Sequence, residues 1–105
     1  MPPRKLKIAH PGEILREEFL EPMGLSAYAL AKSLRIPLPR VNDVVRERRG
    51  ISAEMALLLG AFFDTSETFW VNLQAHYELA RAKPKLAKKL AAVRRERSIS
   101  RRSAT

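Results

Sequence analysis

The sequence predicts an all-α fold, a compact domain of five helices, and three observations support this prediction. Apolar residues recur at spacings of three and four through most of the chain, which is the period of a helix that packs on one side. No stretch alternates convincingly between apolar and polar residues, as a half-buried strand does. Proline, glycine and serine separate the helical stretches, so the connections between the helices are short.

The first helix is expected from Pro11 or Gly12 to Leu20, and Pro22 and Gly24 are expected to end it. Its apolar stripe consists of Ile14, Leu15 and Phe19. The other face carries charges that are interpreted as a solvated surface, namely Glu13, Arg16, Glu17 and Glu18. Early glutamates also suit the positive end of a helix, so this face does not indicate acid–base chemistry.

Serine residues predict the starts of two further helices. Ser26 is a good N-cap for a second helix, which ends near Leu34. Ser52 takes the same position before a fourth helix, whose first turn holds Glu54. The side chains expected to face the core are Leu30, Ala31 and Leu34 in the second helix, and Ile51, Met55, Leu58 or Leu59, and Phe62 around the fourth.

The fifth helix is expected to begin after Asp64 or Ser66 and to run to about Lys83, because Pro84 should break the chain there. Its stripe consists of Phe69, Leu73, Tyr77 and Ala80. The neighbours Phe69 and Trp70 cannot both face one core. One of the two is expected inside, and the other is a candidate for a dimer interface, where aromatic residues are enriched. Tyr77 is a third candidate for such an interface, and an internal aromatic cluster is the alternative.

Charge divides the chain into a basic N-terminal arm (residues 1–10), a helical domain (11–83) and a basic C-terminal tail (84–105). The net charge is +9, and the tail holds eight Lys/Arg against one acidic residue. A weak apolar pattern predicts that the tail is partly helical or disordered, and its last residues, "SISRRSAT", are expected to be disordered. Three roles remain open for the tail. It could add non-specific DNA affinity, which we favour, bind a partner, or touch an anionic membrane surface. Disorder without function is the alternative.

The third helix lies in "IPLPRVNDVVRERRGIS", and its residues divide into two faces. On a helical wheel the valines at 41, 44 and 45 fall on one side, which anchors the helix to the domain. Pro39, Asp43 and Arg46 point the opposite way, with Asn42 on one flank and Arg40 on the other. The helix is expected to begin at Pro39. Leu38 is a poor cap, so the leading amides would be free to bind an anion such as phosphate.

The second and third helices, with the short turn "LRIP" between them, have the spacing of a helix-turn-helix. In that motif the outward residues of the second helix read DNA bases in the major groove. Arg40 and Arg46 suit guanine and Asn42 suits adenine, while Asp43 could accept from cytosine or hold one of the two arginines in place. Residues 32–49 carry six basic and two acidic residues. The phosphate contacts expected there are Lys32, Arg48 and Arg49. The alternative is a helical bundle with ordinary surface arginines, or a protein-binding module with an acidic partner.

Other functions find little support in the sequence. The chain has no cysteine, and its two histidines, His10 and His76, lack ligand spacing, so no metal or cofactor is expected. A capping or surface role is expected for both histidines. No nucleophile–base arrangement or phosphate loop is present, and we expect no enzyme. The longest apolar run is the nine residues Met55–Phe63, and the N-terminus lacks a secretory signal, so a cytoplasmic protein without membrane contact is expected.

Three blocks in this order resemble the HigA-type antitoxins of the Xre/Cro-like helix-turn-helix superfamily. They are "HPGEILREEFLEPMGLS", "IPLPRVNDVVRERRGIS" and "MALLLGAFFDTSETFWVNLQAHYEL", and the likeness covers residues 10–83. The resemblance implies a lambda-repressor-like fold and a homodimer that represses its own operon by binding operator DNA. It also implies neutralisation of a HigB-type, RelE-like mRNA endonuclease toxin. A stand-alone Xre-family repressor without a toxin is the alternative.

The resemblance also bears on single residues. Arg40 and Asn42 match the family's run "P-x-R-[IV]-N-[DE]", and Ser26 matches a position where phosphate contacts are usual. Three departures leave the operator sequence open. Ala27 replaces a frequent glutamine, Arg35 stands where the turn often has glycine, and Arg46-Glu47 replaces an Asn-Gly or Arg-Gly pair, so the exit from the third helix is expected to be longer.

Overall fold

A computed structural model describes residues 8–103, except for the side chains of residues 101–103. Most of the expected basic arm therefore lies outside the described residues. Residues 11–23 form one continuous helical segment, made of α1 (Pro11–Ile14), the π-helical stretch η1 (Leu15–Leu20) and α2 (Glu21–Met23). Within it, the Glu21 amide donates to the carbonyl of Arg16, five residues earlier. Gly24 ends the segment with a φ of 61°, a conformation that glycine adopts without strain.

The first helix is confirmed at its start and is longer than expected. Pro22 does not end it, because this proline follows a wider π turn, where the regular ladder of hydrogen bonds is already interrupted. The next helix along the chain is α3 (Ala27–Leu34), which begins as expected at the N-cap Ser26. The Ser26 Oγ accepts from the Ala29 amide at 3.0 Å. Arg35 ends α3 with a φ of 60°, so it adopts the left-handed backbone that glycine would take more easily.

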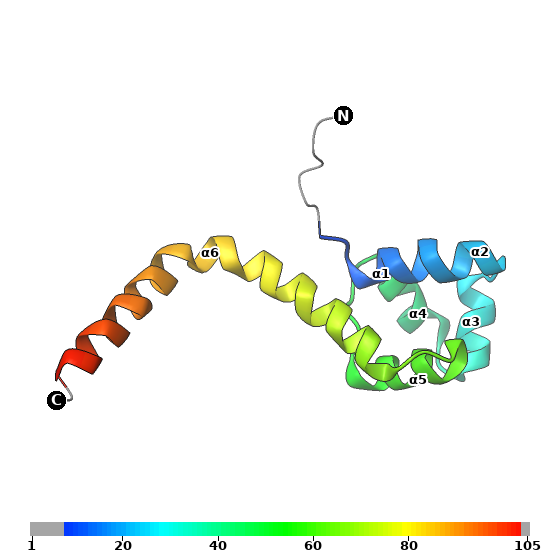
Figure 1. Cartoon of the computed structure of the whole chain (residues 1–105). Helices are drawn as coiled ribbons and strands as arrows, with labels where there is room; N and C mark the ends of the chain where they lie inside the picture. The colour runs from blue at the N-terminus through cyan, green and yellow to red at the C-terminus, as the bar shows by residue number, and fades with distance from the viewer. Residues whose placement is uncertain (1–7, 104–105) are drawn as a thin grey trace.

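The remaining helices are α4 (Leu38–Val45), α5 (Ala53–Phe63) and α6 (Glu67–Ser103). Two further serine caps are confirmed, since the Ser52 Oγ accepts from the Met55 amide and the Ser66 Oγ from the Phe69 amide, both at 3.1 Å. Asp64 instead ends α5 with a φ of 56°. The described residues thus form the expected all-helical fold with a helix-turn-helix in α3 and α4 (Figure 1).

The expected break at Pro84 is wrong, and so is the expected disorder from residue 98 to residue 103. The helix α6 continues through Pro84 to Ser103 and leaves the rest of the molecule as a long curved rod (Figure 1). Proline removes one backbone hydrogen bond and bends a helix, but Pro84 is exposed, so water can reach the carbonyl that loses its partner. Strong helix formers on both sides, mainly alanine, lysine, leucine and arginine, let the helix continue.

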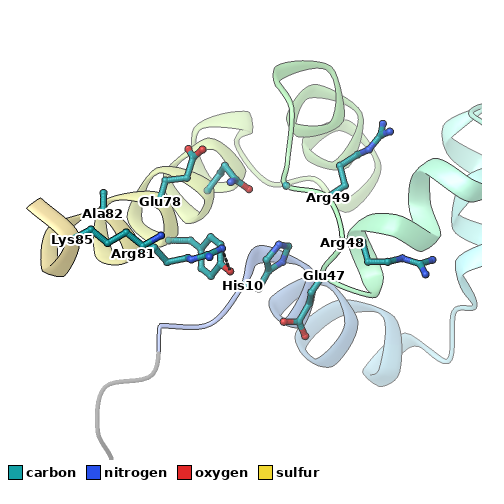
Figure 2. A pocket seen from close by; sticks show the side chains of 11 residues that line it. His10, Glu47, Arg48, Arg49, Glu78, Arg81, Ala82 and Lys85 are labelled. Carbon is teal, nitrogen blue, oxygen red and sulfur yellow. Dashed lines mark hydrogen bonds between the residues drawn. The ribbon is translucent and has the colours of Figure 1, made fainter.

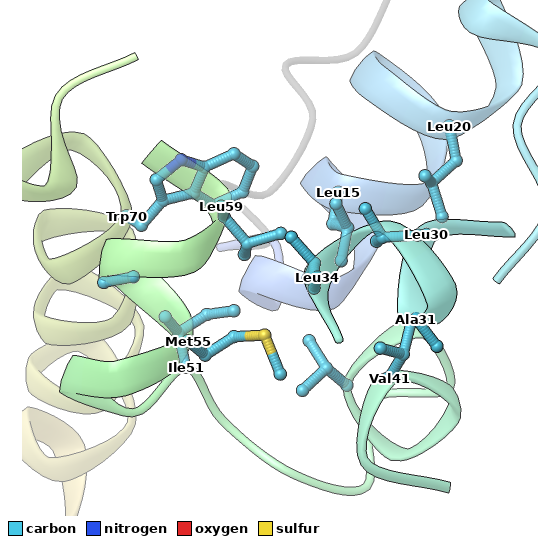
Figure 3. Packing of buried hydrophobic residues seen from close by; sticks show 12 residues of the cluster. Leu15, Leu20, Leu30, Ala31, Leu34, Val41, Ile51, Met55, Leu59 and Trp70 are labelled. Atoms are coloured by element: carbon cyan, nitrogen blue, oxygen red, sulfur yellow. The ribbon is translucent and has the colours of Figure 1, made fainter. Parts of the chain in front are cut away.

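The core lies between the helical segment of residues 11–23 and helices α3, α4, α5 and α6 (Figure 3). Its buried apolar members are Leu15, Leu20, Leu30, Ala31, Leu34, Val41, Val44, Ile51, Met55, Ala56, Leu59 and Trp70. The expected inward faces of the second and third helices are confirmed. The expectation for Phe62 is wrong, because 37% of this residue is exposed, and Leu59 with Ala56 fills the core side of α5 instead.

Two close contacts tie the helices together around α4. A Cβ atom at Gly12 would lie 1.9 Å from the Val44 carbonyl oxygen, so only glycine lets α1 approach the end of α4 this closely. The Gln74 side chain of α6 accepts from the Ile51 amide at 2.7 Å, which fixes the connection between α4 and α5. Within residues 8–103, no helix is both long and apolar enough to cross a membrane.

Candidate nucleic-acid interface

The helix α4 is anchored on one side and presented on the other. Val41 and Val44 are at most 1% exposed, and Val45 is partly buried. Pro39 and Arg46 are exposed, whereas Asn42 and Asp43 are half-buried. The structure thus gives α4 the two faces that its sequence predicts, and the side chains opposite the valines point away from the core.

The N-terminus of α4 differs from its expected form. Pro37 is the N-cap, so the helix begins at Leu38, and Pro39 is its second residue. The amide of Arg40 donates to the Pro37 carbonyl at 3.1 Å. Pro39 has no amide hydrogen. The expected row of free amides at this helix end is therefore shorter than the sequence indicated.

Arg40 is paired with an acidic residue of another helix. Its Nη2 lies 2.5 Å from the Oε1 of Glu54, in the first turn of α5. The Arg40 side chain is 30% exposed and that of Glu54 is 63% exposed, so the pair lies at the edge of the surface formed by α4. The sequence indicates only that Glu54 lies at the positive end of α5 and does not reveal this contact, because the two residues are 14 positions apart.

Asp43 holds a different arginine from the two that the sequence suggested. Its carboxylate Oδ1 lies 3.2 Å from Nη2 of Arg48, rather than pairing with Arg40 or Arg46. The backbone carbonyl of Asp43 also accepts from the amides of Arg48 and Arg49, at 2.7 and 3.0 Å. Arg48 is therefore brought back over α4 by the turn that follows the helix, and this turn could not be seen in a helical wheel.

The exit from α4 is fixed by Arg16, which the sequence alone indicates only as part of a solvated helix face. The Nη1 of Arg16 donates to the Val45 carbonyl at 2.5 Å, and Nη2 pairs with Glu47 at 3.1 Å. The hydrogen bond with Glu47 raises the pKa of Arg16 above its ordinary value. Glu47 itself has a φ of 64°, the left-handed conformation that ends many helices. Arg16 thus satisfies a carbonyl at the end of α4 that no helix turn can reach.

The other expected phosphate contacts lie at the two ends of α3. Ser26 is exposed at its N-cap, and Lys32 is exposed in its last turn. The hydroxyl of Ser26 already accepts from the Ala29 amide, but it keeps its own hydrogen to donate. Arg49 is exposed after α4. Both side chains point away from His10 (Figure 2), and that of Arg48 pairs with Asp43.

His10 caps α1, in agreement with the capping or surface role expected from the sequence. Its Nδ1 accepts from the Gly12 amide at 2.8 Å, and its ring meets that of Tyr77 edge-on, 4.8 Å between centroids. Burial lowers the pKa of His10 below its ordinary value of 6.5, with smaller effects from Glu47 and Arg81. The two rings line an open cavity of about 430 Å³ between the α4–α5 connection and α6 (Figure 2).

The two neighbouring aromatic residues of α6 have different environments. Trp70 is fully buried, and its Nε1 donates to the Thr65 hydroxyl at 2.8 Å, so it is not available to a dimer interface. Phe69 is 38% exposed and lines a second cavity of about 420 Å³ with Ile8, Leu73 and other residues. Tyr77 is half-buried against His10. In the described part of the chain, no three His, Asp or Glu side chains gather as a metal site would require.

Comparison with known proteins places this helix-turn-helix in a family. No family model matches the sequence. The solved structure of the Pseudomonas aeruginosa antitoxin HigA with the higBA promoter is 54% identical, covers 80% of this chain and 91% of that chain, and superposes with a TM-score of 0.76. Virulence-associated protein I of Dichelobacter nodosus is 55% identical over 73 residues, which are 70% of this chain and 68% of that protein.

An uncharacterised HTH-type transcriptional regulator of Haemophilus influenzae is 43% identical over 68 residues, 65% of this chain and 64% of the regulator. The match to solved HigA covers most of the length of both chains at more than half identity. The fold, the presented face of α4 and these similarities agree, and the chain belongs to the HigA-type antitoxin family of Xre-like helix-turn-helix proteins.

Proposed function

We propose that this protein binds operator DNA sequence-specifically through α4 and represses its own operon. The observation that carries the proposal is the anchoring of α4 by Val41 and Val44, which turns Pro39, Asn42 and Arg46 away from the core. Arg40 and Arg46 would donate to guanine, Asn42 would pair with adenine, and Asp43 would accept from cytosine. Ser26, Lys32, Arg48 and Arg49 would bind phosphates on either side.

The charge distribution supports this orientation. Residues 32–49 hold six basic residues and two acidic ones, and both of these acids are already paired with arginines. The P. aeruginosa relative was solved with a promoter, which supports DNA as the binding partner. Specific binding by such a face combines a salt-dependent phosphate component with directional contacts to bases.

The test removes the base-reading arginines and keeps the fold. Arg40→Ala with Arg46→Ala should lower the preference for the upstream promoter over a scrambled duplex by at least tenfold, since each good contact contributes about 1–3 kcal/mol of discrimination. The full-length parent and variant would be compared by footprinting and by fluorescence anisotropy. The matched control is Arg94→Ala with Arg95→Ala, which removes the same charge from the far end of α6. Equal footprints for the parent and the α4 variant would show that α4 does not read the operator.

The toxin partner is the second part of the proposal. An antitoxin of this family would neutralise a HigB-type, RelE-like endonuclease encoded beside it. A neighbouring short basic reading frame whose product co-purifies with this protein and loses toxicity in its presence would support the antitoxin role. A stand-alone Xre-family repressor is the alternative, and the similarity to the H. influenzae regulator favours it equally. Absence of any such neighbouring frame would decide for that alternative.

A homodimer is the third part, and Phe69 is the residue we expect at its interface. Phe69 is 38% exposed beside the apolar cavity that Ile8 and Leu73 line, and the inner edge of its environment is the Trp70 ring, which it meets edge-on at 5.0 Å between centroids. In such a dimer the two α4 helices would lie about 34 Å apart, one turn of the duplex. Sedimentation equilibrium of Phe69→Glu would test this, and a variant that remains a dimer would exclude Phe69 from the interface.

The basic extension of α6 contributes phosphate contacts in this proposal. From Lys85 to Arg97 the helix carries six of the eight basic residues of the segment 84–105, and one acid. Neutralising Lys88 and Arg95 should reduce the slope of log affinity against log salt by up to about two units, without changing the preference for the promoter. An unchanged slope would leave the extension without a part in DNA binding.

A further inference from the structure

Arg40 and Glu54 form an ion pair whose members come from the first turns of two different helices. Arg40 is the third residue of α4, and Glu54 is the second residue of α5. Their contact, 2.5 Å between Nη2 and Oε1, lies at the edge of the α4 surface and is partly open to solvent. Arg46, on the same surface, has no ion pair among the described side chains.

The position of Arg40 is unfavourable for the helix that carries it. The first turn of a helix is its positive end, which repels a cation and attracts an anion. Glu54 is well placed for α5, and its carboxylate also offsets the repulsion that Arg40 meets at the start of α4. Arg40 therefore contributes to the exposed surface of α4 rather than to the stability of that helix, and the carboxylate of Glu54 on the neighbouring helix holds it in place.

The geometry of the contact leaves the guanidinium able to bind a base. Arginine has five N–H donors in a planar fork, and guanine uses two of them through O6 and N7. Glu54 engages one nitrogen, Nη2, through a single oxygen. The Nη1 group and the second hydrogen of Nη2 remain for an incoming acceptor, so contact with Glu54 and contact with guanine are compatible.

The neutral charge of the Arg40–Glu54 pair affects its attraction to phosphates differently from its hydrogen bonding to guanine. Attraction to phosphates depends on net charge and hardly on direction, and it supplies nearly all non-specific DNA binding. The Arg40–Glu54 pair has no net charge, so Arg40 adds little to the affinity for a random duplex. Hydrogen bonds to a guanine edge depend on the orientation of the donors, which the carboxylate helps to fix.

We propose that Glu54 is a specificity-determining residue of the DNA surface, which orients Arg40 toward guanine and cancels its attraction for phosphates elsewhere. The inference rests on the proposed DNA-binding function. It adds to that function a residue outside α4, one that touches no base itself. Its role is to suppress binding to the wrong sequences rather than to strengthen binding to the operator.

The experiment compares Glu54→Gln with Glu18→Gln in the full chain. Glu18 is also exposed, has no ion pair among the described residues, and lies on η1, so its variant makes the same change in net charge elsewhere. The probes are the footprinted upstream promoter duplex and a scrambled duplex of the same composition, each titrated at several salt concentrations. Melting followed by circular dichroism verifies that both variants fold.

Glu54→Gln should tighten binding to the scrambled duplex by roughly three- to tenfold relative to Glu18→Gln, and steepen its salt slope by up to about one unit, because one further cation becomes free for phosphate. The ratio of promoter to scrambled affinity should fall at least threefold. In the presence of Arg40→Gln, Glu54→Gln should no longer change this ratio, since Glu54 acts through Arg40.

Equal ratios for Glu54→Gln and Glu18→Gln would overturn the inference, and so would an effect of Glu54→Gln that persists without Arg40. These results leave the proposed function standing if the parent still prefers its promoter. A parent that binds both duplexes equally would instead contradict the proposed function itself. The two failures are therefore distinguishable in one set of titrations.

Discussion

The first half of α6 packs against α5 and α1, whereas the second half of the same helix contacts little besides itself. Trp70 is fully buried in the first half, and Leu73, Gln74 and Tyr77 are partly buried. From residue 83 to residue 100, only Leu90 and Ala92 are partly buried, and every other residue is exposed. The same backbone structure is thus maintained by tertiary packing in one half and by local helix propensity in the other.

This difference shows what an apolar residue on a helix predicts. Apolar residues at helical spacing occur in both halves, yet only the first half has neighbours to pack against. Leu86 and Val93 are 43% and 56% exposed, although Leu86, Leu90 and Val93 recur at spacings of four and three. Periodicity therefore predicts the helix, and burial depends on where the rest of the chain folds.

Trp70→Ala gives the largest expected effect and tests the packed half. Loss of a fully buried tryptophan should lower the free energy of unfolding by about 3–5 kcal/mol, a large part of the stability of a small domain. Urea denaturation followed by circular dichroism would measure it. The neighbouring Phe69→Ala is the matched control. It should lose about 1 kcal/mol, and equal losses at both positions would contradict the division between an inward and an outward aromatic residue.

His10→Asn gives an intermediate effect, which depends on pH. Burial lowers the pKa of His10, so the unfolded chain takes up the proton first as the pH falls below 6.5. The contribution of neutral His10 to the free energy of unfolding is complete above that pH. It is lost between 6.5 and the folded pKa, with a slope of at most about 1.4 kcal/mol per pH unit.

Asparagine can accept from the Gly12 amide without titrating in this range. Urea titrations of the parent at pH 7.5, 6.5 and 5.5 should therefore show a decline between the last two values that His10→Asn reduces. Parallel pH profiles for the two proteins would mean that the cap is not broken by protonation.

Leu86→Gln with Leu90→Gln tests the exposed half and gives the smallest expected effect. Neither residue touches the core, so the free energy of unfolding should stay within about 0.5 kcal/mol of the parent, measured by urea denaturation. A loss above 1 kcal/mol would show that this half of α6 packs against something in solution. Comparison with Trp70→Ala in the same denaturant series makes the contrast quantitative.

Local signals in the sequence were sufficient for most of the fold. Ser26, Ser52 and Ser66 cap the helices that they were expected to cap, and the valines of α4 face the core. These features depend on residues within one or two helical turns, which a sequence displays directly. The start of α4 was misplaced by one residue, because Pro37 rather than Leu38 takes the cap position.

Contacts between distant parts of the chain could not be predicted in the same way. Arg16 with Val45 and Arg40 with Glu54 join residues 29 and 14 positions apart, and charge patterning gives no partner for either arginine. The sequence does not reveal the helix through Pro84, because proline usually breaks a helix, whereas an exposed proline between strong helix formers only bends the rod. The base and phosphate assignments on α4 stay predictions, which the titrations above address.

The burial of Trp70 has a practical consequence for anyone working with this protein. It is the sole indole in the chain, it lies in the core, and its nitrogen is hydrogen-bonded to Thr65. Fluorescence excited at its absorption edge will therefore report on one place, where α5 meets α6, and its emission should shift to the red when that junction opens to water. The molecule carries its own optical probe, and neither a dye nor a tag is needed to follow its refolding.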